Sequence, residues 1–260
     1  MIRIDTALCT ACGECVVTCE THDIELSDSG AVWLGKDCSE CGHCVAVCPA
    51  EAIHFEGYGE QDVLQYDADT FDIDANRLLN FMKFRRSTRR FTHEHIEKEK
   101  IDLILEAGRF SPTACNDQLL RYVVVKNDMP FVRDLLWEGA ASYAKRANDT
   151  YLLDRYNEYI DSQKQQDALL YGCSHLIFIL ATEENDACIA SSRMELMAHA
   201  LGLGALYLGY GKLAVEESAP LQHYLGETEE SKTQVVIGFG YPYVRWHRTV
   251  PRKPLQVTWK

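Results

Sequence analysis

The chain has 260 residues, of which 47% are hydrophobic, and its formal net charge is −13. This length suits one large domain, or a small domain followed by a medium one. The acidic balance argues against nucleic acid as a partner, because phosphate binding needs a basic surface. The longest clearly apolar run, at 176–181, is far too short to span a bilayer, so we expect no membrane contact. The first residues lead into cysteines without an apolar leader, which predicts a cytoplasmic protein.

Charge is distributed unevenly along the chain. Residues 1–57 hold ten Asp or Glu and two Lys or Arg, and residues 58–75 hold six acidic and no basic residues. The rest of the chain is nearly neutral. We therefore expect a domain at 1–57, an acidic linker at 58–75 and a second domain at 76–260. The linker is either a solvated connector or a segment that docks on the basic stretch 85–90 by charge complementarity.

Eight of the eleven cysteines lie in the first 48 residues, in two runs of spacing C-x2-C-x2-C-x3-C. The first run is Cys9, Cys12, Cys15 and Cys19, and the second is Cys38, Cys41, Cys44 and Cys48. The offset of 29 residues also superposes glycines and apolar positions, which indicates an internal duplication. Three thiolates two residues apart wrap one face of a cubane, and the fourth reaches the other cluster.

This spacing predicts two [4Fe–4S] clusters with crossed ligands. Cluster one would take Cys9, Cys12, Cys15 and Cys48, and cluster two would take Cys38, Cys41, Cys44 and Cys19. Zinc is the alternative, but two complete four-cysteine runs fit zinc poorly. The segment resembles bacterial two-cluster ferredoxins over nearly its whole length. It departs from them at Glu20, which stands where the second copy has Pro49, and His43 is interpreted as an exposed loop residue.

The body of the chain alternates helical and strand-like patterns. Helices are predicted at 96–107, 129–147 and 186–201, and strands at 121–125, 175–181 and 234–238. This alternation indicates a sheet covered by helices.

A basic segment at 84–91 contains four arginines and two hydroxyl side chains. Guanidinium groups bind phosphate oxygens in bidentate fashion, so this segment is a candidate phosphate cradle, which Arg252 and Lys253 could close. Taken alone, each basic cluster is more often a solvated patch.

Three later segments favour the phosphate site over a solvated patch. They are Phe110–Gln118, with the pattern P-T-x-x-N-x-Q, Ala200–Gly209, with G-L-G, and Ile237–Pro242, with G-x-P. Together with the R-R-S-x-R segment, their order resembles the FMN-dependent nitroreductase family over about residues 77–260. The chain departs from the family pattern at Thr113, which replaces a serine.

The resemblance implies an α+β fold, in which a ferredoxin-like two-cluster module precedes a nitroreductase-type domain, and a homodimer with FMN at the interface. Arg85, Ser87 and Arg89 would hold the FMN phosphate and ribityl chain and approach the pyrimidine edge, assisted by Arg86. Thr113, Asn116 and Gln118 would meet the flavin from the partner subunit. Leu208 and Gly209 would present backbone N–H groups to the ring, and Arg252 and Lys253 would complete the phosphate site.

The glycine pairs at 202–204 and 238–240 do not predict a dinucleotide site, because neither stands between a strand and a helix. Cys115, Cys173 and Cys188 are interpreted as buried small hydrophobes, with Cys115 in the flavin motif the candidate for reactivity.

The sequence thus predicts a flavin-dependent oxidoreductase that uses two clusters and FMN to reduce an organic acceptor, such as a nitroaromatic, a quinone or an activated alkene. Two alternatives stay open, an electron-transfer or redox-sensing module without turnover and an NAD(P)H-driven flavin reductase. External ferredoxin and NAD(P)H are both candidate donors, and no side chain is identified as catalytic.

Overall fold

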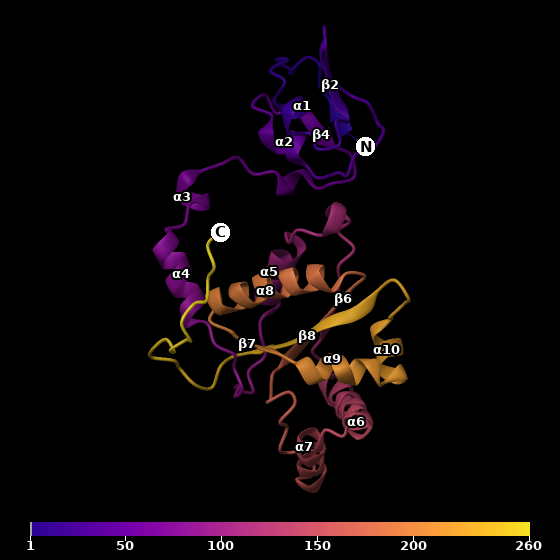
Figure 1. Cartoon of the computed structure of the whole chain (residues 1–260), viewed down its shortest axis with the longest axis vertical. Helices are drawn as coiled ribbons and strands as arrows, with labels where there is room; N and C mark the ends of the chain where they lie inside the picture. The colour runs from indigo at the N-terminus through magenta and orange to yellow at the C-terminus, as the bar shows by residue number, and fades with distance from the viewer. Residues whose placement is uncertain (1) are drawn as a thin grey trace. The chain divides into compact units, whose positions relative to one another are not determined.

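The computed structural model describes residues 2–260, which form two units (Figure 1). The first unit runs up to Ile73 and includes Cys115–Asp117. The second unit comprises Asp74–Ala114 and Gln118–Lys260.

The first unit is built from two structural repeats. Its elements are β1 (Ile2–Ile4), α1 (Glu14–Thr18), β2 (Ile24–Ser27), β3 (Gly30–Trp33), α2 (His43–Val47) and β4 (Ile53–Phe55). Strand β1 pairs with β4 and β2 pairs with β3, both antiparallel. Ile2 lies opposite Phe55, and Leu26 opposite Ala31, so the two pairings are related by the same 29-residue offset as the cysteines. The duplication predicted from the sequence is therefore confirmed.

The repeat extends to the backbone conformation of the cysteine loops. Gly13 and Gly42 precede α1 and α2 with φ of 78° and 77°. This left-handed conformation is open to glycine without steric cost. It turns each loop directly into a helix, and these two helices carry the buried Cys15 and Cys44.

The acidic stretch at 58–75 contains short helical pieces. They are the 3-10 turn η1 (Glu60–Asp62) and helix α3 (Ala68–Phe71), followed in the second unit by α4 (Ala75–Phe84). Asp67 accepts a hydrogen bond from the N–H of Asp69, and Asp74 accepts one from the N–H of Arg77 at 2.7 Å. Two of the acidic residues thus cap helix N-termini, a role that the charge pattern alone did not reveal.

The second unit is organised around a four-stranded antiparallel sheet of order β5-β6-β8-β7. The strands are β5 (Arg121–Val125), β6 (His175–Ala181), β7 (Gly204–Tyr207) and β8 (Lys232–Gly240). The predictions for β5 and β6 are confirmed, and β8 extends two residues further at each end than expected. The sequence did not predict β7, because it is short and directly follows a glycine-rich helix end.

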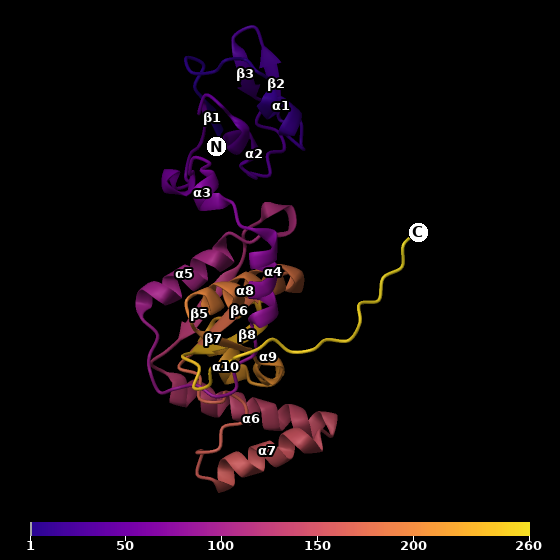
Figure 2. The ribbon, with the colours of Figure 1, turned by 90° about the vertical axis from the view of Figure 1, so that its left-hand side faces the viewer.

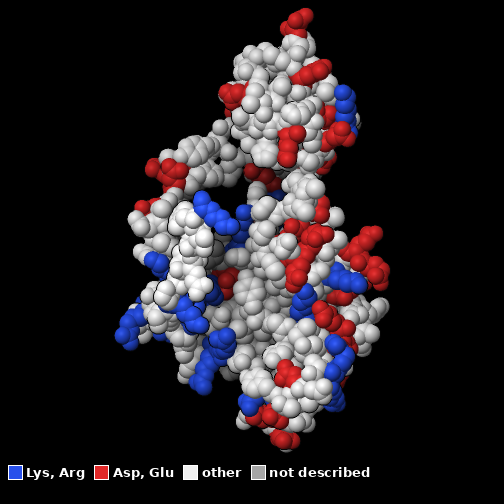
Figure 3. All heavy atoms as spheres, viewed as in Figure 1, with Lys and Arg blue, Asp and Glu red and all other residues white. Residues whose placement is uncertain are grey.

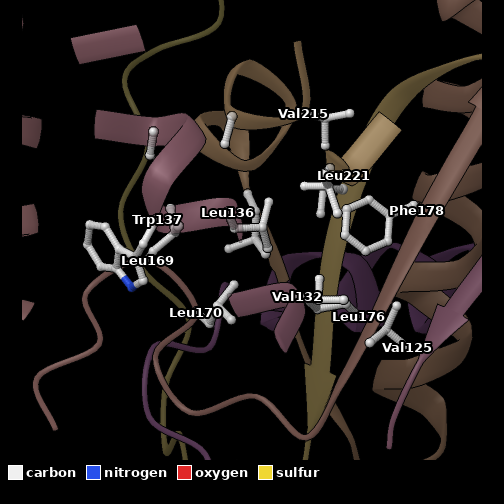
Figure 4. Packing of buried hydrophobic residues seen from close by; sticks show 14 of the residues in the cluster. Val125, Val132, Leu136, Trp137, Leu169, Leu170, Leu176, Phe178, Val215 and Leu221 are labelled. Atoms are coloured by element: carbon white, nitrogen blue, oxygen red, sulfur yellow. The ribbon is translucent and has the colours of Figure 1, made fainter. Parts of the chain in front are cut away.

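Helices pack on both faces of this sheet. They are α5 (Lys98–Arg109), α6 (Met129–Ala147), α7 (Thr150–Asp161), α8 (Glu184–Ala200), α9 (Gly209–Glu216) and α10 (Ala219–Leu225). Successive residues of β6 enter two different cores. Phe178 packs with residues of α6 and α9, as Figure 4 shows around Leu136 and Val215. Ile177 and Ile179 pack with residues of α5 and α8. This two-sided burial explains why β6 reads as a continuous apolar run, and the predicted α+β fold class is confirmed.

The chain ends in a segment without helix or strand from residue 249 onward. Figure 2 shows it leaving the second unit as an extended tail. The tail carries apolar side chains that are almost fully exposed, Leu255 at 88% and Trp259 at 91%. None of the helices in the described part of the chain is both long and apolar enough to cross a membrane.

Candidate redox sites

The eight clustered cysteines line two separate pockets in the first unit. One pocket is lined by Cys9, Cys12, Cys15 and Cys48, and the other by Cys19, Cys38, Cys41 and Cys44. In each pocket the fourth cysteine comes from the opposite run. The fold therefore brings together the two sets that crossed ligation requires.

The chemistry of the pockets fits an iron–sulfur cubane. Backbone N–H groups reach the sulfur atoms in corresponding places: Asp23 N lies 3.3 Å from Cys19 Sγ, and Ala52 N lies 3.3 Å from Cys48 Sγ. Hydrogen bonds to sulfur are one of the means by which proteins set cluster potentials. Among the described residues no three His, Cys, Asp or Glu side chains converge on a single ion. Four thiolates spread around a pocket wall match a cubane, whose irons occupy separate corners.

The thiol groups differ in their acidity. Hydrogen bonds from the backbone N–H groups of Ala31 and Ala11 lower the pKa of Cys9. Burial raises the pKa of Cys44 to about 11. His43, interpreted from the sequence as a loop residue, is exposed, and its Nδ1 lies 3.1 Å from Cys41 Sγ.

Arg85, the first candidate flavin residue, is the C-terminal cap of α4. Its Nη1 donates to Oε1 of Glu195 at 2.6 Å. Glu195 lies on α8 and is 8% exposed. Burial raises the pKa of Glu195, and the neighbouring Arg85 opposes that shift. Sequence reasoning missed Glu195, although a carboxylate among the small and apolar core positions of α8 is a signal for a buried partner.

The residues after Arg85 run along β7, which is an edge strand of the sheet. Ser87 forms a bridge with Ala205, and the N–H of Thr88 donates to the carbonyl of Ala205 at 2.9 Å. A Cβ at Gly204 would lie 2.4 Å from Thr88 Oγ1, so glycine permits this approach. These contacts fix Ser87 at the sheet edge, with Arg86 half-buried and Arg89 exposed.

The predicted partner-facing residues lie in an unusual loop. Cys115, Asn116 and Gln118 all have φ between 52° and 56°, which is costly for residues other than glycine. Thr113 Oγ1 accepts from the N–H of Gln118 at 3.0 Å. Within the first unit, the Asn116 amide donates to the carbonyls of Ser39 and Glu40 at 3.2 and 3.0 Å. The role of these residues against a partner's flavin stays a prediction.

The remaining candidates lie at the end of β7 and in the tail. Leu208 is buried, and its N–H donates to the carbonyl of Val236 at 2.9 Å. Its N–H is therefore used inside the sheet, and Gly209 is exposed at the start of α9. The roles of Leu208 and Gly209 at a flavin ring stay predictions. Arg252 and Lys253 are exposed in the extended tail.

The interpretation of the three other cysteines was wrong for two of them. Cys173 is buried, and desolvation raises the pKa of its thiol. Cys115 and Cys188 are exposed, the first in the left-handed loop and the second on the outer side of α8. The apolar content around a cysteine in the sequence does not reveal which side of a helix it occupies.

Comparisons with known proteins agree with this geometry. Residues 8–53 match the model of the 4Fe-4S dicluster domain, and residues 82–241 match the model of the nitroreductase family. The chain is 27% identical over 167 residues to a protein of Methanothermobacter thermautotrophicus named "Putative NADH dehydrogenase/NAD(P)H nitroreductase". That alignment covers 64% of this chain and 77% of the relative.

Two solved structures are similar to the second unit. A nitroreductase with bound FMN from Bacteroides fragilis superposes with a TM-score of 0.59 at 21% identity, covering 71% of this chain and 100% of that one. A protein from Desulfovibrio desulfuricans in complex with FMN superposes with a TM-score of 0.51 at 26% identity, covering 70% of this chain and 94% of that one.

The fold and the cysteine pockets define a redox protein with an iron–sulfur module in its first unit. The family model spans more than half of the sequence, from α4 to the end of the sheet. The chain belongs to the nitroreductase family.

Proposed function

We propose that this protein passes electrons from two [4Fe–4S] clusters to FMN and then to a small organic acceptor. Membership of the nitroreductase family makes it a flavin-dependent oxidoreductase. The match at residues 8–53 adds an iron–sulfur domain. The observation that carries the proposal is the partition of the eight cysteines into two four-cysteine pockets. A chain with two such pockets followed by a flavin-binding domain contains the sites needed for electron transfer from clusters to flavin.

The chain's own residues provide the binding sites. The two pockets hold the clusters through the crossed sets of cysteines. Bound FMN supplies the hydride or electron chemistry at the second unit, while the protein positions it. Arg85, Ser87 and Arg89, with Arg86, Arg252 and Lys253, meet its phosphate and ribityl chain, since guanidinium groups favour phosphate oxygens. Gly209 lies at the ring, and Thr113, Asn116 and Gln118 approach it from a second subunit.

External reduced ferredoxin is the donor that fits this arrangement best. Fusion on a short linker raises the effective concentration of one redox module near the other to about the millimolar scale. Plant-type ferredoxins have potentials of about −400 mV. A donor in that range would reduce a flavin downhill through the clusters.

NAD(P)H is the second candidate donor, because the relative from M. thermautotrophicus carries both nucleotides in its name. In that case the protein is an NAD(P)H-driven flavin reductase. A carrier or redox sensor without turnover would pass electrons only to proteins. Steady-state reduction of a nitroaromatic, a quinone or an activated alkene separates an enzyme from such a carrier.

Anaerobic stopped-flow reduction of the flavin tests the proposal. The wild type, Cys12→Ser and Cys41→Ser are each mixed with reduced ferredoxin, NADH or NADPH. Cys188→Ser is the control, because this exposed cysteine on α8 lies outside the two runs and the flavin motif. We expect ferredoxin to be the fastest donor to the wild type and the control, and to lose that advantage in both cluster variants. If NADH reduced all four proteins equally fast and ferredoxin reduced none, the clusters would not be the entry port.

We also propose that the working form is a homodimer in the cytoplasm. Helix α4 has no buried residue, and its Leu78, Leu79 and Met82 are 37%, 48% and 43% exposed. The tail adds further exposed apolar side chains at Leu255 and Trp259. A second copy of the chain would cover these surfaces, and a cytoplasmic location suits a protein rich in reduced cysteines.

A further inference from the structure

The two cysteine pockets are built by the same repeat but differ at one buried position. Asp23 and Ala52 are 29 residues apart and occupy equivalent places, because each donates its N–H to the fourth cysteine of its run. Asp23 is 2% exposed and Ala52 is 1% exposed. One pocket therefore has a buried carboxylate beside Cys19 where the other has a methyl group beside Cys48.

The Asp23 carboxylate is held by two hydrogen bonds. Its Oδ2 accepts from Trp33 Nε1 at 2.7 Å, and its Oδ1 accepts from the N–H of Lys36 at 2.8 Å. Both donors are neutral N–H groups, so these bonds fix the carboxylate without cancelling its charge. The residue that corresponds to Trp33 in the first repeat is Ile4, which has no such donor.

The other polar groups around the pockets add to this difference. The pocket with Cys48 is lined by no Asp, Glu, His, Lys or Arg, whereas the pocket with Cys19 is also lined by Glu20, Asp23 and His43. A hydrogen bond from His43 to Cys41 would favour the reduced cluster, which opposes Asp23. Both Glu20 and His43 are exposed, so water screens them more than it screens the buried Asp23.

We propose that Asp23 makes the cluster in the Cys19 pocket the harder of the two to reduce. Adding an electron increases the negative charge of a cluster, and a buried carboxylate repels that charge strongly in a low-dielectric surrounding. The cluster in the Cys48 pocket has no such charge in its wall and is reduced first. This inference rests on the proposed assignment of the cysteines to two clusters.

Redox poising of the full-length protein followed by EPR tests the proposal. The protein is held anaerobically at a series of potentials, and the signals of the reduced clusters give a midpoint for each. We expect two resolved midpoints in the wild type. Asp23→Asn, which keeps the shape, and Asp23→Ala, which copies the second repeat, should raise only the lower midpoint. The ratio of reduced to oxidised second cluster at a fixed potential should rise about tenfold, which is about 59 mV for one electron.

Glu20→Gln is the matched control, because it removes an exposed carboxylate from the same pocket and should shift the midpoint much less. One shared midpoint in the wild type, or a shift of the higher midpoint in the Asp23 variants, would overturn the proposal. Should the Asp23 variants lose iron, the hyperfine-shifted cysteine β-proton NMR signals of the partly reduced wild type decide the order instead. Reduction of the Cys19 pocket before the Cys48 pocket would then refute it. Iron analysis giving fewer than about eight irons per chain would instead contradict the two-cluster assignment itself.

Discussion

At the scale of single residues, the structure adds partners that the sequence could not assign. The arginine of the R-R-S-x-R segment was recognisable by its motif, but its ion pair with Glu195 joins residues that are 110 positions apart. Only the packing of α8 against the end of α4 brings them together. The same holds for Asp23, whose importance comes from its burial and from the alanine in the other repeat.

The first residue-scale prediction concerns FMN affinity. Arg85→Ala removes a charged hydrogen-bond donor and leaves Glu195 buried without its cation. We expect the binding free energy of FMN to weaken by about 1.5–3 kcal/mol, the scale of a hydrogen bond to a charged group. Equilibrium dialysis with flavin fluorescence measures the dissociation constant, and Arg90→Ala is the control, since Arg90 is exposed and lies outside the motif. An unchanged affinity in Arg85→Ala, or release of FAD on denaturation, would contradict the assignment.

The second concerns the pH dependence of stability. His175 is 1% exposed, and burial, followed by Lys126 and His95, lowers its pKa to about 4. As the pH falls below about 6.5, His175 takes up a proton in the unfolded chain but stays neutral in the folded chain until the pH nears 4. Protonation therefore stabilises the unfolded state, and the free energy of unfolding is highest above pH 6.5 and decreases as the pH falls toward 4. That loss amounts to about 3 kcal/mol over the window.

Urea unfolding followed by circular dichroism at several pH values checks this. We expect His175→Gln to flatten the decline of the unfolding free energy between pH 6.5 and 4. Replacement of the exposed His93 by glutamine should leave the wild-type decline in place. Equal slopes in the wild type and His175→Gln would exclude His175 as the cause.

At the scale of elements, burial made the long β6 predictable, but the short helices α9 and α10 were not predicted although they carry buried core residues. Strand β6 is buried along its whole length, and its continuous apolar run was sufficient to predict it. Helix α4 and strand β7 were missed for opposite reasons. Helix α4 has no buried face within the chain, and β7 has only four residues beside a glycine turn. The cysteine spacing, in contrast, was sufficient to predict which four cysteines line each pocket. The short distances between the thiolates leave the loops few other arrangements.

One element-scale prediction tests the contact between α6 and α9. A Cβ at Gly139 would lie 2.2 Å from the carbonyl oxygen of Ala214, a backbone atom that cannot rotate away. Gly139→Ala should therefore lower the unfolding free energy by about 1–3 kcal/mol, as overpacking does. Gly209→Ala is the control for stability, because nothing lies within 4 Å of a Cβ at that position. Equal midpoints of urea unfolding in the two variants would mean that the helices can separate at little cost.

At the scale of the whole molecule, charge divides the protein. Figure 3 shows acidic side chains over the first unit, and Lys and Arg gathered on the side of the second unit that carries α4 and the tail. The sequence already placed the charge boundary at the acidic stretch. It could not show that the basic side also carries the exposed apolar face of α4, because that requires knowing which residues the chain leaves uncovered.

The whole-molecule prediction concerns assembly. Leu79→Lys introduces a charge on the exposed face of α4 and should shift a dimer toward the monomer, with loss of bound FMN. Leu103→Lys makes the same change on α5, where Leu103 is 46% exposed, and should leave the assembly unchanged. Sedimentation velocity gives the mass of each variant. A wild-type protein that sediments as a monomer, or a dimer in Leu79→Lys, would show that α4 is not the interface.

The 29-residue repeat has a consequence for the ancestry of the first unit. With crossed ligands, neither repeat supplies all four cysteines of a cluster. Each repeat contributes three thiolates to one cluster and one thiolate to the other cluster. An ancestral peptide with a single repeat could have completed its clusters only as a homodimer, in which each copy supplied its last cysteine to the cluster of the other copy. Joining two such peptides in one gene would turn a symmetric pair into a single chain. Only after that fusion could the two halves mutate separately and acquire an aspartate on one side and an alanine on the other.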